Sequence, residues 1–328
     1  MTQETISKIV KASGVQSGEL ILIHFWGEDS EKGTANRFMT AVAQQGATPI
    51  LQQQSRSLNR EIFLAADENC FGEKYFELFT KFDAVLDIFT YQPVILGYEI
   101  DREHFELYRR YMAQLFEKLT ACKRFTQIRI PTAANAEESG LEPQDYMERM
   151  ERAYDIDYDA LKEACGKEME RFSGMDGTRL LSGEDCVLSF ELKGRTWHMD
   201  TGDGDLPCGE IYIAPQEEKT QGNVWFETLY LDEKKYRNVV LEIKDGMVCG
   251  SSGPEVAEFF VKQPRENRVV CELGFGMNKN VTNLCGYTVL DEKMYGTFHI
   301  AVGANHMFGG KNMASCHIDF VGHGEIIF

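Results

Sequence analysis

The chain has 328 residues, of which 43% are hydrophobic and 11% aromatic, so it is long enough to bury a substantial core in about two domains. Its formal net charge of -18 argues against a nucleic-acid partner, because binding to phosphates needs a basic surface. No apolar stretch reaches the roughly 20 residues of a membrane span, and the N-terminal residues show no secretory signal. We therefore expect a cytoplasmic protein with no nucleic acid and no membrane as partner.

The first half of the chain alternates short apolar runs with longer amphipathic stretches. This pattern predicts strands at 18–26, 47–53, 82–89 and 125–132, and helices at 31–45, 57–66, 101–121 and 141–172. Strands that alternate with helices favour parallel pairing with right-handed crossovers. The fold class is therefore predicted to be α/β, with an open α/β domain over residues 1–180.

The pattern changes from Cys186 onward, where short apolar strands are separated by Gly, Asp and Asn. A linker rich in glycine, GMDGTRLLSG, precedes this change. We expect residues 181–328 to form a second domain that is mostly β, barrel-like, and carries the chemistry of the protein.

Histidines and carboxylates cluster in this second half. In the segment CHIDF, His317 and Asp319 are two residues apart on a predicted strand, so their side chains project from the same face. In GTFHIAVG, His299 points away from the side of its apolar neighbours. Each pattern alone is also typical of a solvated strand or of a core histidine, so neither decides a function by itself.

Two carboxylates lie in or beside apolar strands, Glu210 in CGEIY and Glu272 in VCELG. An ionised side chain in such a place is costly unless it is paired, hydrogen-bonded or bound to a metal. Taken singly, each is equally compatible with a strand edge in water. Three carboxylates and two imidazoles together suit a pair of divalent ions such as Zn, Co or Mn, with a water in an open position. The predicted metal ligands are Glu210, Glu272, His299, His317 and Asp319.

Several segments then resemble the metallo-aminopeptidases of the thermophilic aminopeptidase T (leucyl aminopeptidase) type. CELGFGMN is similar to that family's E-L-G-x-G-x-N, GTFHIAVG to its G-T-x-H-I-A-x-G, and GGKNMASCHIDF to its G-x-N-x-S-x-x-H-x-D-F. LKGRTWHMDTGDGDLPCGEIYIAP resembles the segment that contains its G-E-V-F-T-x-P strand, and IRIPTAANAEESGLEPQDYMERM resembles a segment upstream. The resemblance runs from about residue 125 to the C-terminus.

The resemblance implies a hydrolase that removes the N-terminal residue of short peptides through a water bound by two divalent metals. It implies the same five metal ligands, a catalytic role for Glu272 and a homodimer. Where that family has a tyrosine seven residues after its first histidine, this chain has His306, which we expect to donate a hydrogen bond to a developing oxyanion or to act as a general acid.

A second family of this fold offers an alternative. The ring-cleaving 2,5-dihydroxypyridine dioxygenases hold one Fe(II) with two histidines and an aspartate, and His299, His317 and Asp319 would supply that triad. The presence of Glu272 favours two metals and hydrolysis. A catalytically silent homologue that binds little metal is a third possibility.

Overall fold

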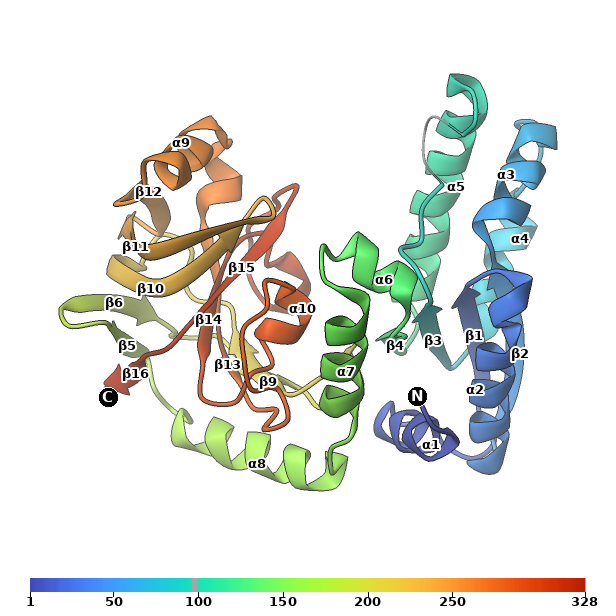
Figure 1. Ribbon diagram of the computed structural model, residues 1–328, viewed down its shortest axis with the longest axis horizontal. Helices are drawn as coiled ribbons and strands as arrows, with labels where there is room; N and C mark the ends of the chain where they lie inside the picture. Colours follow the sequence, from blue (N-terminus) through green and yellow to red (C-terminus); the bar gives the residue numbers. More distant parts are fainter. Residues whose placement is uncertain (96–98, 328) are drawn as a thin grey trace. The chain divides into compact units, whose positions relative to one another are not determined.

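Figure 1 shows the computed structural model of the protein, which describes residues 1–95 and 99–327. The chain forms two compact units, Met1–Tyr158 with Gly202–Pro207 and Asp159–Thr201 with Cys208–Phe328. The expected boundary at residue 180 falls inside strand β5 (Gly177–Ser182). The compact units therefore divide the chain earlier than the composition suggested, and residues 202–207 return to the first unit.

The first unit contains a parallel sheet whose central strands β1 and β3 are almost entirely buried. Their sequences, LILIHFW and AVLDIF, are near-continuous apolar runs, as expected for parallel strands covered on both faces. The described strands of this sheet, in spatial order, are β2 (Thr48–Gln54), β1 (Leu20–Trp26), β3 (Ala84–Phe89), β4 (Arg124–Arg129) and β8 (Asp205–Leu206).

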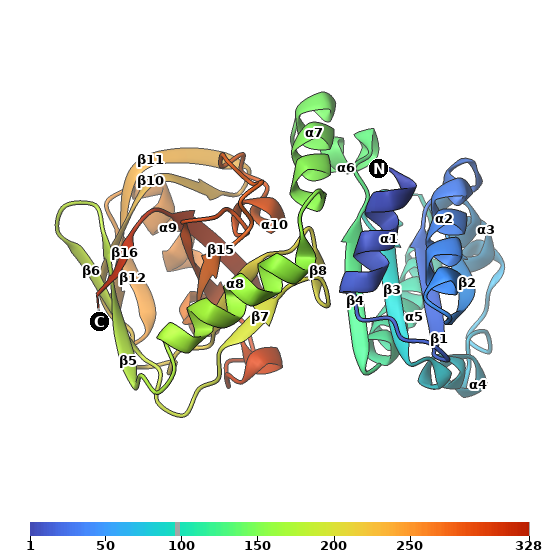
Figure 2. The same ribbon diagram turned by 90° about the horizontal axis from the view of Figure 1, so that it is seen from below.

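Helices cover both faces of this sheet (Figures 1 and 2). α1 packs on α2, and α2 contacts β1 and β2. On the other face, Leu22 and Val85 join a core cluster with residues of helices α3 to α5, among them Phe63, Phe76 and Tyr111. The helices of the unit are α1 (Gln3–Ala12), α2 (Lys32–Gln44), α3 (Arg56–Ala65), α4 (Glu73–Glu77), α5 (Arg102–Thr120), α6 (Ala133–Glu138) and α7 (Pro143–Tyr154), with short 3-10 turns η1 (Asp29–Glu31) and η2 (Leu78–Lys81).

These elements confirm the predicted α/β fold class, and the four predicted strands of the first half occur within a few residues of their expected ends. The helix expected over 141–172 is wrong in one respect, because it is broken into α7 and α8 (Tyr158–Arg171). The break contains Asp155 and Asp157, and aspartate side chains favour turns by bonding to nearby backbone groups.

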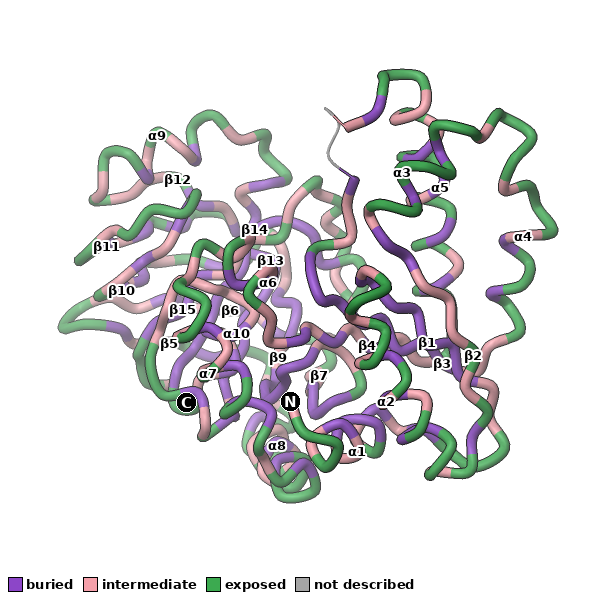
Figure 3. Tube along the Cα trace, turned by 45° about the vertical axis from the view of Figure 1, so that its right-hand side comes forward, coloured by how far each residue is buried: buried purple, intermediate pink, exposed green. Residues whose placement is uncertain are grey.

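The second unit is mostly β, and its described strands form two antiparallel sheets. Side chains from the two sheets share one core, in which Phe226 of β10 lies 5.6 Å from Phe298 of β14 between ring centroids. Figure 3 shows buried residues along strands of both units. The first sheet consists of β12 (Met247–Ser251), β11 (Lys234–Lys244), β10 (Gln221–Leu231), β6 (Cys186–Glu191), β5 and β16 (Glu325–Ile327).

The second sheet carries most of the residues that the sequence marked as functional. Its strands, in spatial order, are β15 (His317–Gly322), β14 (Phe298–Gly303), β13 (Val270–Gly276), β9 (Glu210–Ile213) and β7 (His198–Asp200). The other elements of the unit are α8, α9 (Pro254–Lys262), α10 (Thr288–Asp291), η3 (Arg265–Arg268) and η4 (His306–Phe308). Among the described helices of the whole chain, none is long and apolar enough to pass through a membrane.

Candidate metal centre

The five predicted ligands lie on neighbouring strands of the second sheet. They are Glu210 on β9, Glu272 on β13, His299 on β14, and His317 and Asp319 on β15. Cross-strand partners point to the same face, and so do residues two apart on one strand. The register of the four strands therefore puts all five side chains on one face, while Leu273, Ile300 and Phe320 point into the core on the other.

Small residues stand opposite these side chains in the sheet and leave space above it. A Cβ atom added to Gly274 would lie 2.0 Å from Nε2 of His299, a distance that no real contact shows. The imidazole of His299 therefore occupies the space that any other residue at position 274 would fill. The small cross-strand partners are Gly276 for Glu210, Gly274 for His299, Ala301 for both Glu272 and Asp319, and Gly303 for His317. On their other sides, Glu210 pairs with Asp200 and His299 with Val321.

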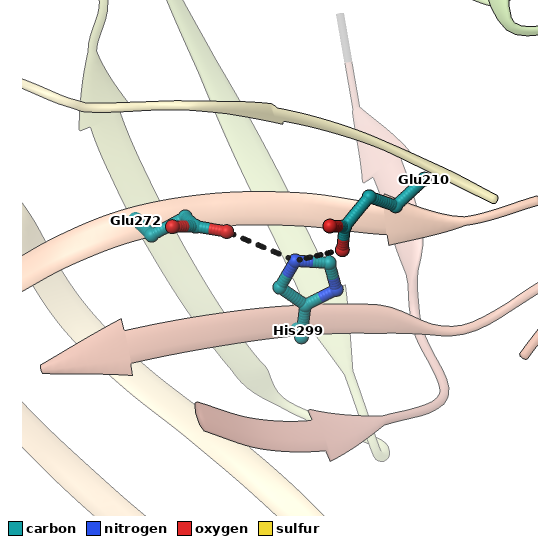
Figure 4. A group of neighbouring side chains, drawn as sticks. All are labelled: Glu210, Glu272 and His299. Atoms are coloured by element: carbon teal, nitrogen blue, oxygen red, sulfur yellow. Dashed lines mark hydrogen bonds and ion pairs between the residues drawn. The ribbon is translucent and has the colours of Figure 1, made fainter. Parts of the chain in front are cut away.

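Glu210, Glu272 and His299 form a first group, in which one ligand atom from each residue lies within 4.8 Å of the others. All three residues are buried. Nε2 of His299 lies 3.2 Å from Oε1 of Glu272 and 3.4 Å from Oε2 of Glu210. Figure 4 shows the two carboxylates approaching the same imidazole nitrogen from opposite sides. We call this group the first position.

Glu272, His317 and Asp319 form a second group of the same kind. Nε2 of His317 lies 3.5 Å from Oε2 of Glu272 and 3.5 Å from Oδ2 of Asp319. We call this group the second position. The two positions share Glu272, whose Oε1 faces His299 and whose Oε2 faces His317. A carboxylate placed in this way has the arrangement needed to bridge two cations.

Two observations test whether these residues fit a metal. Oε2 of Glu210 and Oδ1 of Asp319 are buried and accept no hydrogen bond from any described residue, and buried acceptors are rarely left so. Nδ1 of His317 lies 2.9 Å from the carbonyl oxygen of Ala304. Because a carbonyl can only accept, Nδ1 carries a proton, so in the neutral imidazole the lone pair that a metal needs is on Nε2. The donor set therefore fits divalent cations.

Burial and mutual charge shift the pKa values of the group strongly. Burial raises the pKa of Glu210 to about 8, against the opposing effect of the Lys293 ammonium. Burial alone would lower the pKa of His299, but its hydrogen bond with Glu272 and the charge of Glu210 raise it to about 9. Burial would also raise the pKa of Asp319, and the neighbouring His317 holds it below its ordinary value. Clusters with such shifts are typical of functional sites.

Two charged residues beside the first position were missed by sequence reasoning. The side chain of Lys293 is 1% exposed, and its Nζ lies 2.5 Å from Oε1 of Glu210 and 2.7 Å from Oε1 of Glu292. Both residues belong to the segment LDEKMYG. Nothing in its spacing indicates burial, since a run of charged residues before a glycine is typical of a solvated turn.

His306, the predicted catalytic histidine, lies apart from the two groups. It is exposed at the start of η4 and belongs to neither group of ligand atoms found among the described residues. Two residues further on, the ring of Phe308 packs 6.0 Å from the imidazole of His317 and 5.4 Å from the ring of Tyr212, measured between centroids. The loop of His306 thus runs past the second position.

Comparison with known proteins identifies the family. The family model described as thermophilic metalloprotease (M29) matches residues 8–322. The chain belongs to this family. The predicted resemblance to the aminopeptidase T type is thereby confirmed, and by family the protein is a metallo-aminopeptidase, a hydrolase that uses a divalent metal.

Two solved structures share the fold. Wild-type AmpT from Thermus thermophilus is 17% identical, with a TM-score of 0.70, over 99% of this chain and 94% of that one. A 2,5-dihydroxypyridine dioxygenase from Pseudomonas putida KT2440 is 15% identical, with a TM-score of 0.64, over 99% of this chain and 92% of that one. No curated protein matches the chain in sequence.

Proposed function

We propose that the protein hydrolyses the N-terminal peptide bond of short peptides, with two divalent metal ions held by Glu210, Glu272, His299, His317 and Asp319. The single observation that carries this proposal is the placement of Glu272, which directs one carboxylate oxygen to each histidine. The orphaned oxygens of Glu210 and Asp319 support it further. Zn, Co and Mn all suit a set of three carboxylates and two imidazoles.

When bound, such a pair of ions supplies a water made nucleophilic near neutral pH and polarises the scissile carbonyl. The residues of the chain position the metal site and attract the substrate. Glu272 links the two positions by directing one carboxylate oxygen to each. The carbonyl oxygen of Ala304 keeps a proton on Nδ1 of His317. The carboxylates of the site, together with the net charge of -18, attract the free ammonium group of a peptide N-terminus.

His306 is proposed to donate a hydrogen bond to the tetrahedral intermediate from the loop beside the second position. General-acid or oxyanion contacts of this kind contribute roughly 10²- to 10⁴-fold to a rate. Replacement by alanine should therefore lower kcat by about 100-fold while leaving the metal content unchanged. A variant His306→Ala with the kcat of the unmodified protein would remove the residue from the mechanism.

The experiment that tests the function compares two matched substrates. The purified protein, loaded in turn with Zn, Co and Mn, is given a dipeptide with a free N-terminus and the same dipeptide N-acetylated. We expect hydrolysis of the free dipeptide only, loss of activity on chelation, and recovery on adding metal back. Cleavage of both substrates alike would exclude an aminopeptidase, and no hydrolysis with any metal would exclude a peptidase of this type.

A mononuclear Fe(II) dioxygenase is the second candidate, and the likeness in fold to the Pseudomonas putida enzyme favours it. Its triad would need His299, His317 and Asp319 around one ion, yet the two histidines belong to different groups. Oxygen consumption with 2,5-dihydroxypyridine by the iron-loaded protein would favour this candidate. A folded protein inactive in both assays would instead be a silent homologue.

Homodimeric assembly and a cytoplasmic location are further parts of the proposal, and both are inferred from the family resemblance and the sequence. Light scattering of the purified protein measures the first. A mass twice that of the 37.3 kDa chain is expected, and a monomeric mass at micromolar concentration would contradict it.

A further inference from the structure

Lys293 provides a buried positive charge beside the first position. It follows α10 in the chain, and its ammonium bridges the carboxylates of Glu210 and Glu292. The exposed fractions of these two carboxylate side chains are 10% and 14%. A lysine is almost never buried so completely unless it is paired. Since a cation beside a metal position also repels the metal, its placement there needs a compensating role.

The two carboxylate oxygens of Glu210 differ in their surroundings, because the ammonium of Lys293 binds only one of them. Oε1 accepts the hydrogen bond from Nζ. Oε2 accepts none from the described residues and lies 3.4 Å from Nε2 of His299. The carboxylate is therefore oriented with one oxygen held by the protein and the other aimed at the first position.

We propose that Lys293 is a positioning residue for the first position, which holds Glu210 as a ligand through one oxygen and is itself held by Glu292. This inference rests on the proposed metal centre. The second position has a separate support, because His317 is fixed by the carbonyl oxygen of Ala304. Loss of Lys293 should consequently weaken one metal position far more than the other.

The test is a metal titration of the variant Lys293→Met, which keeps the length of the side chain and removes its charge. Metal-free protein is titrated with Co(II), whose absorption spectrum reports the coordination of each ion, and with Zn(II) in competition with a chromogenic chelator. Groups that orient a ligand typically contribute 10- to 100-fold to metal affinity. We expect one binding step to weaken by about that factor and the other to change by less than about threefold.

Three further variants make the result specific. Lys293→Arg keeps a cationic donor and should restore part of the affinity. Glu292→Gln removes the anchor of Lys293 without touching a proposed ligand, and should weaken the same step to a smaller extent. Lys279→Met is the matched control, because Lys279 is exposed and lies over the ring of Tyr295, and its titration should equal that of the unmodified protein.

Unchanged or tighter binding of both metals by Lys293→Met would overturn the inference, since it would mean that the ammonium only repels the ion. Should this variant fail to fold, as judged by circular dichroism, the titrations of Lys293→Arg and Glu292→Gln decide by the same criterion. A result that contradicts the proposed function can be distinguished from one that contradicts the role of Lys293. It would be seen in the unmodified protein, as absence of peptide hydrolysis or of a second metal.

Discussion

At the scale of single residues, the candidate centre depends on small residues in the sheet as much as on the proposed ligands. Glycine or alanine stands opposite every proposed ligand in the sheet. Gly274 is the clearest case, because its missing Cβ leaves the space occupied by the imidazole of His299. A larger residue at that point would move the imidazole away from Glu210 and Glu272.

The variant Gly274→Ala tests this packing. The added methyl group overlaps the His299 ring, so we expect the loss of at least one bound metal and a fall in peptidase activity of about 100-fold or more, as when a reacting group is misplaced by about 1 Å. Elemental analysis and the dipeptide assay measure both effects. Gly166→Ala is the control, because no atom lies within 4 Å of a Cβ at that glycine. Equal metal content in the two variants would contradict the account.

The five proposed ligands could be predicted because strands repeat every two residues. His317 and Asp319 had to share a face once the segment was recognised as a strand, and the cost of burying Glu210 and Glu272 required partners for them. Lys293 could not be found in the same way. It lies outside the strands, and its burial results from the arrangement of α10 and β9, which no local pattern records.

At the scale of elements, apolar runs predicted the strands of the first half well, but other elements were missed. α1 was missed, although Thr2 caps its N-terminus by accepting a hydrogen bond from the backbone of Thr5. β8 was also missed, because two residues that pair with β4 far away in the sequence leave no periodicity to detect. A strand as short as β8 is determined by its tertiary contacts.

One element of the first unit depends on a carboxylate at its start. Glu28 accepts hydrogen bonds from the backbone N–H and the hydroxyl of Ser57, in the first turn of α3, and from the hydroxyl of Tyr91 at 2.9 Å. Burial alone would raise the pKa of Glu28, but these hydrogen bonds hold it below its ordinary value of 4.5. The charged carboxylate therefore stabilises this end of α3.

Replacement of Glu28 by glutamine should lower the free energy of unfolding by about 1–2 kcal/mol at pH 7, the usual cost of losing hydrogen bonds to a charged group. The folded-state pKa is depressed, so the stabilisation is present above pH 4.5 and is lost as the pH falls through that lowered pKa. Urea unfolding at several pH values measures it. Glu61→Gln, an exposed site on the same helix, should change stability by less than about 0.5 kcal/mol. Identical pH profiles for Glu28→Gln and the unmodified protein would count against this role.

At the scale of the whole molecule, composition predicted two parts of different character, and the structure has an α/β unit followed by a mostly β unit. The residues at which the two units divide were harder to predict. A strand as short as β8 belongs to the first sheet although it lies between β7 and β9 of the second unit in the chain. The family match over residues 8–322 includes the first half, where the motifs were weak.

The central claim, a two-metal centre bridged by Glu272, is tested most directly by elemental analysis of anaerobically purified protein and of its Glu272→Gln variant. We predict about two equivalents of Zn, Co or Mn per chain in the unmodified protein, with affinity for both ions reduced in the variant because the shared carboxylate serves both positions. Peptidase activity should fall with them. A single iron per chain, or two metals retained with near-normal turnover after the substitution, would contradict the account.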